Sequence, residues 1–291
     1  MAGKRTSTGD TGSGGGSIRV GIGGWTYAPW RDNFYPKGLV QRRELEFASR
    51  HVTAIEVNGT WYGAQKPPTY AKWRDEAPDG FVFAAKAPQR ITRSRVLANT
   101  GAQVEDFLEG IATLGAKLGP IVWQFEQGRR PQREDLAGFV ASLPASAGGI
   151  ALRHVLDVRD ADCVDAGYLA LARRHGCATV FTDSAEHPSF ADLTAPFVYA
   201  RLMRSRSSEP AGYPDGELRR WAGRIREWSC GGAPADLPYL ETAAGEDAGA
   251  DAAVLPATPR DVFVFFIAAA KERNPAAAVA LLRLLGAGAG G

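Results

Sequence analysis

The chain has few of the residues from which disulfide and metal sites are built. Its 291 residues include three cysteines, Cys163, Cys177 and Cys230, and four histidines. An odd and sparse set of cysteines with no CxxC pair argues against a disulfide framework and indicates a reducing compartment, so we expect a cytoplasmic protein. The histidines are not clustered along the chain, and the sequence predicts no transition-metal site.

Long apolar runs are also missing. No stretch approaches the ~20 apolar residues that a membrane helix needs, so we expect no membrane association. The first 17 residues are rich in Gly, Ser and Thr and have no apolar centre of the kind that a secretory signal needs. We expect residues 1–17 to form a disordered leader. The net charge of +2 is too small to indicate a strong duplex binder on charge alone.

What the chain does have is a regular alternation of strand-like runs and amphipathic segments. The runs span residues 18–25, 53–58, 81–86, 120–125, 154–159, 178–183, 197–202 and 261–267. Eight strands alternating with helices predict a single (β/α)₈ barrel of the TIM type over residues 18–291. An open, doubly wound sheet is the alternative. The GIGG stretch at Gly21 favours it little, because it lacks the third glycine of a dinucleotide-binding loop.

Two connections depart from this regular pattern. The sixth, HPSFADLTAP, has room for only a short helix. The segment at about 230–260 is rich in Ala, Gly, Pro and Asp, and we expect a long flexible loop there, at the face of the barrel opposite its active-site mouth.

A carboxylate inside a strand is the clearest sign of a functional site. In AIEVNGTWYG, residues 54–63, Glu56 interrupts an apolar run and Asn58 follows on the same face of the strand. Burying a carboxylate is costly, and barrel enzymes place their chemistry where the strands end. We therefore expect Glu56 at the mouth of the barrel, where water still reaches it, with Lys86 on the next strand as its partner.

Other polar residues fall at the same ends of the predicted strands. We interpret Glu56 as a candidate general acid or base, with Lys86 and Asp157 as further catalytic candidates. The candidate ligand-binding residues are Trp25, Tyr27, Asn58, Thr60, Tyr62, Gln124, Arg159, Asp183, Arg201 and Arg204.

The mouth loops carry an excess of arginine, which suits a small anionic ligand, phosphorylated or carboxylated. Nucleic acid or a nucleotide is the alternative ligand. The contacts would then come from Arg93, Arg95, Arg129, Arg130 and Arg204. A third hypothesis is that the charged residues only pair with one another and plug the barrel. We predict no cofactor; Mg²⁺ held by Glu56, Asp157 and Asp183 is a weak alternative. The sequence does not indicate an oligomeric state.

The strings GIGGWTYAPWRDNFYP, AIEVNGTWY, GFVFAAKAPQRIT, LGPIVWQF, LDVR, FVYARL and VFVFF resemble the YecE-like family, a domain of unknown function numbered 72. The resemblance runs from about Ile18 to the last helix and implies a (β/α)₈-type barrel. It implies no particular activity, so hydrolase, lyase and isomerase chemistry all stay open. It also implies that Glu56, Asn58, Lys86 and Gln124 occupy usual polar positions of the family.

The chain departs from the family pattern where histidines and asparagines are usual. The family's usual strand-five motif, Glu-x-Arg-His, is replaced here by Asp157-Val158-Arg159-Asp160. The usual His-Gly after Arg201 is replaced by Met203-Arg204. A usual Thr-His reads Thr92-Arg93, and the asparagines after the last strand read Ala268-Ala269. These departures speak against a histidine-dependent mechanism and predict a divergent member with a more basic pocket.

Overall fold

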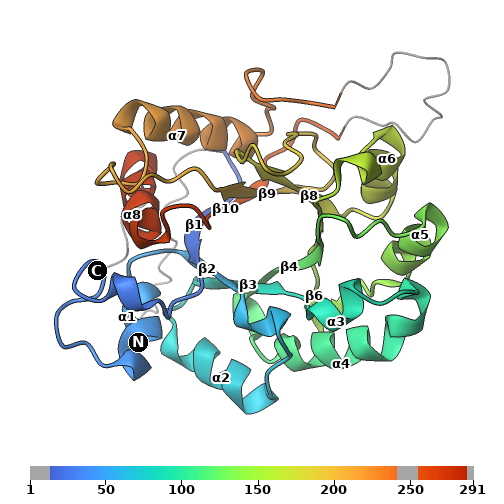
Figure 1. Cartoon of the computed structure of the whole chain (residues 1–291), viewed down its shortest axis with the longest axis horizontal. Helices are drawn as coiled ribbons and strands as arrows, with labels where there is room; N and C mark the ends of the chain where they lie inside the picture. Colours follow the sequence, from blue (N-terminus) through green and yellow to red (C-terminus); the bar gives the residue numbers. More distant parts are fainter. Residues whose placement is uncertain (1–13, 241–254, 287–291) are drawn as a thin grey trace, which may run out of the picture.

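The computed structural model describes residues 14–240 and 255–286, and it is a closed barrel of eight parallel strands (Figure 1). Around the barrel the strands run in the order β1, β10, β9, β8, β7, β4, β3 and β2. Their bounds are Ile18–Gly23 (β1), Ala54–Val57 (β2), Val82–Lys86 (β3), Leu118–Phe125 (β4), His154–Val158 (β7), Ala178–Thr182 (β8), Phe197–Leu202 (β9) and Asp261–Phe266 (β10). The first strand pairs with both the second and the last, which confirms the predicted (β/α)₈ barrel.

Helices form a ring outside the barrel (Figure 1). They are α1 (Glu44–Ala48), α2 (Pro67–Glu76), α3 (Gln89–Thr92), α4 (Gly101–Ala112), α5 (Arg133–Ser142), α6 (Ala166–Arg174), α7 (Asp215–Ser229) and α8 (Asn274–Leu285). The short helix expected between β8 and β9 is absent; residues 183–196 are irregular there. A small hairpin of β5 (Ser146–Ala147) and β6 (Ile150–Ala151) precedes β7.

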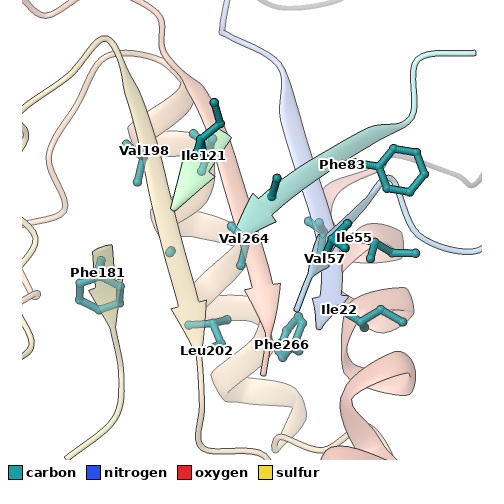
Figure 2. Packing of buried hydrophobic residues seen from close by; sticks show 14 of the residues in the cluster. Ile22, Ile55, Val57, Phe83, Ile121, Phe181, Val198, Leu202, Val264 and Phe266 are labelled. Carbon is teal, nitrogen blue, oxygen red and sulfur yellow. The ribbon is translucent and has the colours of Figure 1, made fainter. Parts of the chain in front are cut away.

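Strand alternation divides the core in two. One set of side chains, which includes Ile55, Phe83 and Val264, belongs to the large cluster that also contains the helices' buried residues (Figure 2). The intervening residues form a second cluster inside the barrel, made of Ala54, Ala84, Val122, Val155, Ala178, Val180, Ala195, Phe197, Tyr199, Phe263 and Phe265. Because side chains point to opposite faces at each step, the residues two positions after members of this second cluster also face the barrel interior.

Gly21 explains the glycine-rich start of the first strand. A Cβ atom there would lie 2.0 Å from the backbone carbonyl oxygen of Ala54 on the neighbouring strand. Gly21 pairs with Ala54 in the barrel register, so the missing side chain allows β1 and β2 to approach closely. The GIGG stretch therefore serves barrel closure rather than a dinucleotide-binding loop.

At the face of the barrel opposite the mouth, part of the expected disordered leader, residues 1–17, is ordered. Residues 14–17, which we placed in a disordered leader, are among the described residues, and Gly16 and Ser17 contact α7 and β10. The backbone N–H of Gly16 donates to the carbonyl oxygen of Ser229 at 2.9 Å, and the hydroxyl of Ser17 donates to Asp261 at 2.6 Å. Residues 1–13 of the expected leader and residues 241–254 of the expected loop lie outside the described residues. Among the described residues, no helix combines the length and the apolar character needed to cross a membrane.

Candidate functional site at the barrel mouth

Polar side chains replace apolar ones inside the barrel as the strands approach their carboxyl ends. Ala54, Ala84, Val122, Val155 and Tyr199 belong to the inner apolar core. Two residues further along, the same strands carry Glu56, Lys86, Gln124, Asp157 and Arg201. Because the period of a strand is two, all five polar side chains face the interior at the mouth. Together with Tyr199 and Arg159 they are called the mouth cluster below.

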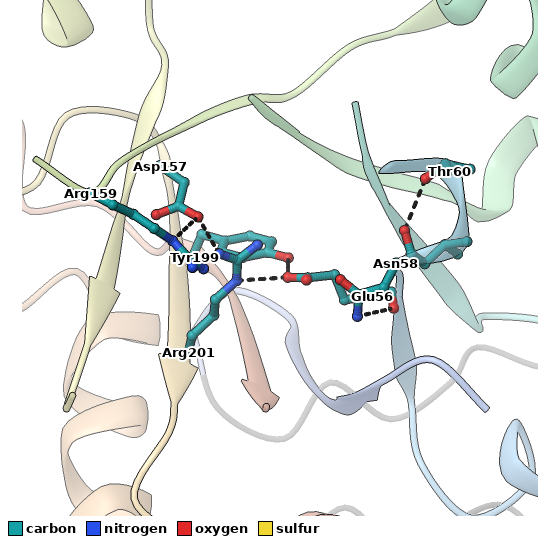
Figure 3. Close-up of polar contacts among 8 residues, drawn as sticks. Glu56, Asn58, Thr60, Asp157, Arg159, Tyr199 and Arg201 are labelled. Atoms are coloured by element: carbon teal, nitrogen blue, oxygen red, sulfur yellow. Dashed lines mark hydrogen bonds and ion pairs between the residues drawn. The ribbon is translucent and has the colours of Figure 1, made fainter. Parts of the chain in front are cut away.

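The mouth cluster is held together by Arg201. Its Nε donates to Oε2 of Glu56 at 2.9 Å, and its Nη1 donates to Oδ2 of Asp157 (Figure 3). The hydroxyl of Tyr199 donates to the same Oε2 of Glu56 at 2.5 Å, and Nε of Arg159 donates to Oδ2 of Asp157 at 3.3 Å. One buried chain of hydrogen bonds therefore joins side chains from β2, β7 and β9.

Burial and the attraction of opposite charges act in opposite directions on the pKa values of Arg201 and Asp157. Burial alone would lower the pKa of Arg201 and raise that of Asp157. The opposite charges win in both cases: Glu56 and Asp157 raise the pKa of Arg201, and Arg201 and Arg159 lower the pKa of Asp157. Burial, and then the nearby Glu56 carboxylate, raise the pKa of Tyr199 far above its ordinary value. Tyr199 is therefore a fixed donor at neutral pH.

Lys86 stands apart from the hydrogen-bonded chain. Its Nζ lies 4.2 Å from the centre of the Trp61 ring, a cation–π contact, and no carboxylate of the described residues is within ion-pair distance. Burial lowers its pKa to about 8; Glu56 opposes this shift, and Arg201 and Arg159 add to it. The cluster thus contains three basic side chains against two carboxylates.

Two expectations about Glu56 are wrong. Its side chain is 1% exposed, so water does not solvate the carboxylate in the way we expected. Its direct partners are Tyr199 and Arg201 rather than Lys86. Both contacts use Oε2, which leaves Oε1 outside this pair of hydrogen bonds.

The structure brings only some of the candidate ligand-binding residues into the cluster. Gln124 pairs with Asp157 in the register of β4 and β7, is 3% exposed, and has a buried Oε1 with no hydrogen-bond partner. Nδ2 of Asn58 reaches only the carbonyl oxygen of Glu56, at 3.5 Å. The hydroxyl of Thr60 is buried against the carbonyl oxygens of Val57 and Lys86, where it supports the ends of the strands.

Other candidates lie away from the cluster. The ring of Trp25 packs edge-on against Trp73 of α2 at 5.0 Å, outside the barrel. The ring of Tyr27 lies beneath Lys271. The side chain of Tyr62 is 82% exposed. Arg204 is exposed as well.

Asp183 is occupied in a backbone-supporting role at the start of the loop after β8. Its carboxylate accepts from the backbone N–H of Met203 at 2.6 Å and from the hydroxyl of Tyr213 at 2.9 Å. Burial raises the pKa of this carboxyl group. The alternative magnesium site needed Asp183 beside Glu56 and Asp157. Within residues 14–240 and 255–286, no three His, Cys, Asp or Glu side chains are grouped so that they could hold a metal ion.

Sequence reasoning missed two residues at the site. Tyr199 was absent from the candidates although it precedes Arg201 by two positions on β9, so the alternation could have found it. His187, in the loop after β8, was also absent from the candidates. It lines a small cavity together with Asp157, Arg159 and Arg201, and its Nδ1 is buried without a partner. The cavity volume is about 10 Å³, enough for roughly one water molecule. Burial and then Arg159 lower the pKa of His187.

Three of the five mouth-loop arginines proposed for nucleic acid already have partners for their side chains. Arg93 pairs with Glu126, and Arg130 pairs with Asp160 and Asp162. Arg129 donates to the backbone carbonyl oxygens of Thr92 and Ser94. Of the five arginines proposed for nucleic acid, only Arg95 and Arg204 have side chains without such a contact among the described residues.

Comparison with known proteins shows the family of this chain. A model of the family described as "Protein of unknown function DUF72" matches residues 19–290, almost the whole chain. The chain belongs to this family. The UPF0759 protein YecE of Escherichia coli K12 is 28% identical over 139 residues, which are 47% of this chain and 48% of YecE. The UPF0759 protein YunF of Bacillus subtilis 168 is 31% identical over 75 residues, 26% of each chain.

The match to YecE thus spans about half of that relative's length, while solved structures match along almost the whole barrel. A DUF72 family protein of Thermotoga maritima MSB8 is 17% identical with a TM-score of 0.69, covering 93% of this chain and 99% of that one. A DUF72 family protein of Enterococcus faecalis V583 is 15% identical with a TM-score of 0.63, covering 94% and 99%. At these identities the likeness shows a shared fold, and this DUF72 protein is a divergent member of the family.

Proposed function

We propose that this DUF72 protein binds a small anionic molecule at the mouth of its barrel and acts on it. The observation that carries the proposal is the charge balance of the mouth cluster. Lys86, Arg159 and Arg201 face only two carboxylates, and Nη2 of the buried Arg201 has no hydrogen-bond partner. An uncompensated buried cation is costly, and a carboxylate or phosphate group would compensate it.

The geometry assigns different roles to the two sides of the mouth. On the side of β7 and β9, Arg159 and Arg201 reach the small cavity that His187 also lines, and they are the proposed anion ligands. On the side of β2 and β3, Lys86 and Glu56 supply the chemistry, with Asp157 holding both arginines in place. A ligand larger than one water requires the loop of residues 183–196 to move, because that loop contributes His187 and Pro188 to the cavity.

The alternative, binding of nucleic acid, has weaker support because three of the five relevant arginines already contact other groups of the protein.

The three cysteines are free, which is compatible with the reducing cytoplasm that we propose as the protein's compartment.

The proposal is tested by thermal unfolding at constant ionic strength with phosphate, glycerol phosphate and malonate, and with glycerol as a neutral control. A ligand that binds only the folded state raises Tm in proportion to ln(1 + [L]/Kd). We expect the anions but not glycerol to raise Tm, and Arg159→Gln to abolish the shift. Arg206→Gln, a change at an exposed loop arginine paired with Glu217, is the matched control and should keep it. Equal shifts in both variants would remove the proposed site.

A further inference from the structure

We propose that Lys86 is an imine-forming amine, whose Nζ adds to the carbonyl carbon of a small aldehyde or ketone that also carries a carboxylate or phosphate. This inference rests on the proposed function, since Arg159 and Arg201 are to hold the anionic group. It adds the reactive group and the class of substrate.

The position of Lys86 is the first support. It is the last residue of β3, and it faces the interior because Ala84, two positions earlier, belongs to the inner core. The strands on either side place Glu56 and Gln124 at the same mouth. The hydroxyl of Thr60 donates to the backbone carbonyl oxygen of Lys86 at 2.6 Å and so helps to hold the end of β3 in position.

The surroundings of Nζ are the second support. The nitrogen lies over the face of Trp61 and makes no hydrogen bond or ion pair with the described residues. Lys117 shows the contrast: its Nζ donates to the carbonyl oxygens of Arg74 at 2.7 Å and Ala77 at 2.6 Å. A structural lysine is anchored in that way, whereas the nitrogen of Lys86 is free to approach a carbonyl carbon.

Protonation agrees with the geometry. Only the neutral amine is nucleophilic, and the pKa of about 8 leaves about a tenth of Lys86 neutral at pH 7. Burial is the main cause, with Arg201 and Arg159 contributing. Lys271 also has a lowered pKa, but its Nζ lies 4.5 Å from the Tyr27 ring and 5.6 Å from the Trp30 ring, apart from the mouth cluster.

The step balances without a further reactant. The lone pair of the neutral Nζ forms a bond to the carbonyl carbon while the carbonyl π electrons move to oxygen. A proton passes from nitrogen to that oxygen and gives a carbinolamine. Loss of the second nitrogen proton and of the hydroxyl group as water then forms the carbon–nitrogen double bond. The products are the imine and one water, and nothing is oxidised or reduced.

Pyridoxal phosphate, used only as an anionic aldehyde probe, tests the inference on the full chain. The protein is incubated with the probe, the imine is reduced by hydride from sodium borohydride, and labelled lysines are mapped by mass spectrometry. We expect Lys86 to be labelled at least about tenfold faster than the exposed Lys66, because the lowered pKa of Lys86 makes more of its amine nucleophilic at pH 7. Lys86→Arg should keep the probe-induced rise in Tm and lose the label at this site.

Pyridoxal, which lacks the phosphate, separates this inference from the proposed function. A rise in Tm with pyridoxal phosphate but no faster labelling of Lys86 than of Lys66 would overturn the imine and leave the anion site standing. Equal labelling of Lys86 by both aldehydes, with no rise in Tm from either, would overturn the anion site and with it the anionic class of substrate.

Discussion

Arg201 and Glu56 are joined across the inside of the barrel, although their strands are not neighbours. Arg201 lies on β9 and Glu56 on β2, and β10 and β1 stand between them. Both side chains are almost completely buried, and their contact is 2.9 Å long. The ion pair therefore links opposite parts of the wall, and the same guanidinium reaches Asp157 on β7. These ion pairs hold strands of the barrel together, and the same buried cluster contains three basic side chains against two carboxylates.

The structural role gives a prediction for Glu56→Gln. The change leaves three basic side chains against one carboxylate in a buried site, and removing one partner of a buried pair is strongly destabilising. We expect the free energy of unfolding to fall by about 3 kcal/mol. Urea unfolding followed by circular dichroism measures it. The same substitution at Glu46, which pairs with Arg43 on the surface, should have little effect. An unchanged midpoint for Glu56→Gln would mean that the carboxylate is not required by the fold.

Tyr199→Phe isolates one hydrogen bond of the same chain. The hydroxyl of Tyr199 donates to the Glu56 carboxylate in a buried position, and a hydrogen bond to a charged group contributes about 2 kcal/mol. Because the pKa of Tyr199 is raised far above its ordinary value, we expect the same loss of stability at pH 6 and at pH 9. Chemical unfolding at the two pH values measures it. Tyr62→Phe, at an exposed ring, is the control, and a loss confined to one pH would contradict the assignment.

Lys86→Met should change how stability depends on pH. The pKa of Lys86 is about 8 in the folded protein and 10.5 for the ordinary side chain. Between these values the unfolded chain binds the proton and the folded chain does not, so stability of the wild type rises with pH across this range. Below pH 8 both states are protonated, and the folded state bears the full cost of a buried charge.

We therefore expect Lys86→Met to be more stable than the wild type at pH 7, by at most about 3 kcal/mol, with the difference shrinking as the pH rises from 8 to 10. Unfolding free energies at pH 7, 8.5 and 10 provide the measurement. Lys66→Met, at an exposed lysine, is the matched control. A destabilised Lys86→Met at pH 7 would indicate that the contact with Trp61 outweighs the burial of the charge.

The sequence predicted the strands of the barrel well because alternation and strand spacing are local properties. Glu56, Asp157 and Arg201 could be assigned to the mouth from their positions alone. The partners of Glu56 could not be assigned in the same way. Lys86 lies on the strand next to Glu56, whereas Arg201 is separated from it by two strands, so strand order alone favours Lys86. Curvature of the closed wall brings the longer Arg201 across the interior instead.

Loop geometry explains why Trp25 lies away from the mouth cluster. Trp25 follows the end of β1, and strand alternation says nothing about a residue beyond a turn. Gly24 has a φ of 73°, a left-handed conformation that redirects the chain. Trp25 then packs against Trp73 of α2 rather than entering the mouth. The burial of Glu56 was equally hard to predict from the sequence, because the mouth is closed by long side chains that come from several strands.

The basic loops lead to a last prediction, which concerns nucleic acid. Arg93 and Arg130 are paired with carboxylates, so neutralising phosphates would first require breaking those ion pairs. We expect no saturable binding of a short fluorescein-labelled DNA duplex at micromolar protein and physiological salt, measured by fluorescence anisotropy. At low salt, weak binding should fall steeply as salt is added, because it depends on counterion release. Arg95→Ala or Arg204→Ala should weaken it more than Arg93→Ala, whose side chain already pairs with Glu126. Tight binding that resists salt and depends on Arg93 would instead show that the loop ion pairs open for a polyanion, and would make nucleic acid the better candidate ligand.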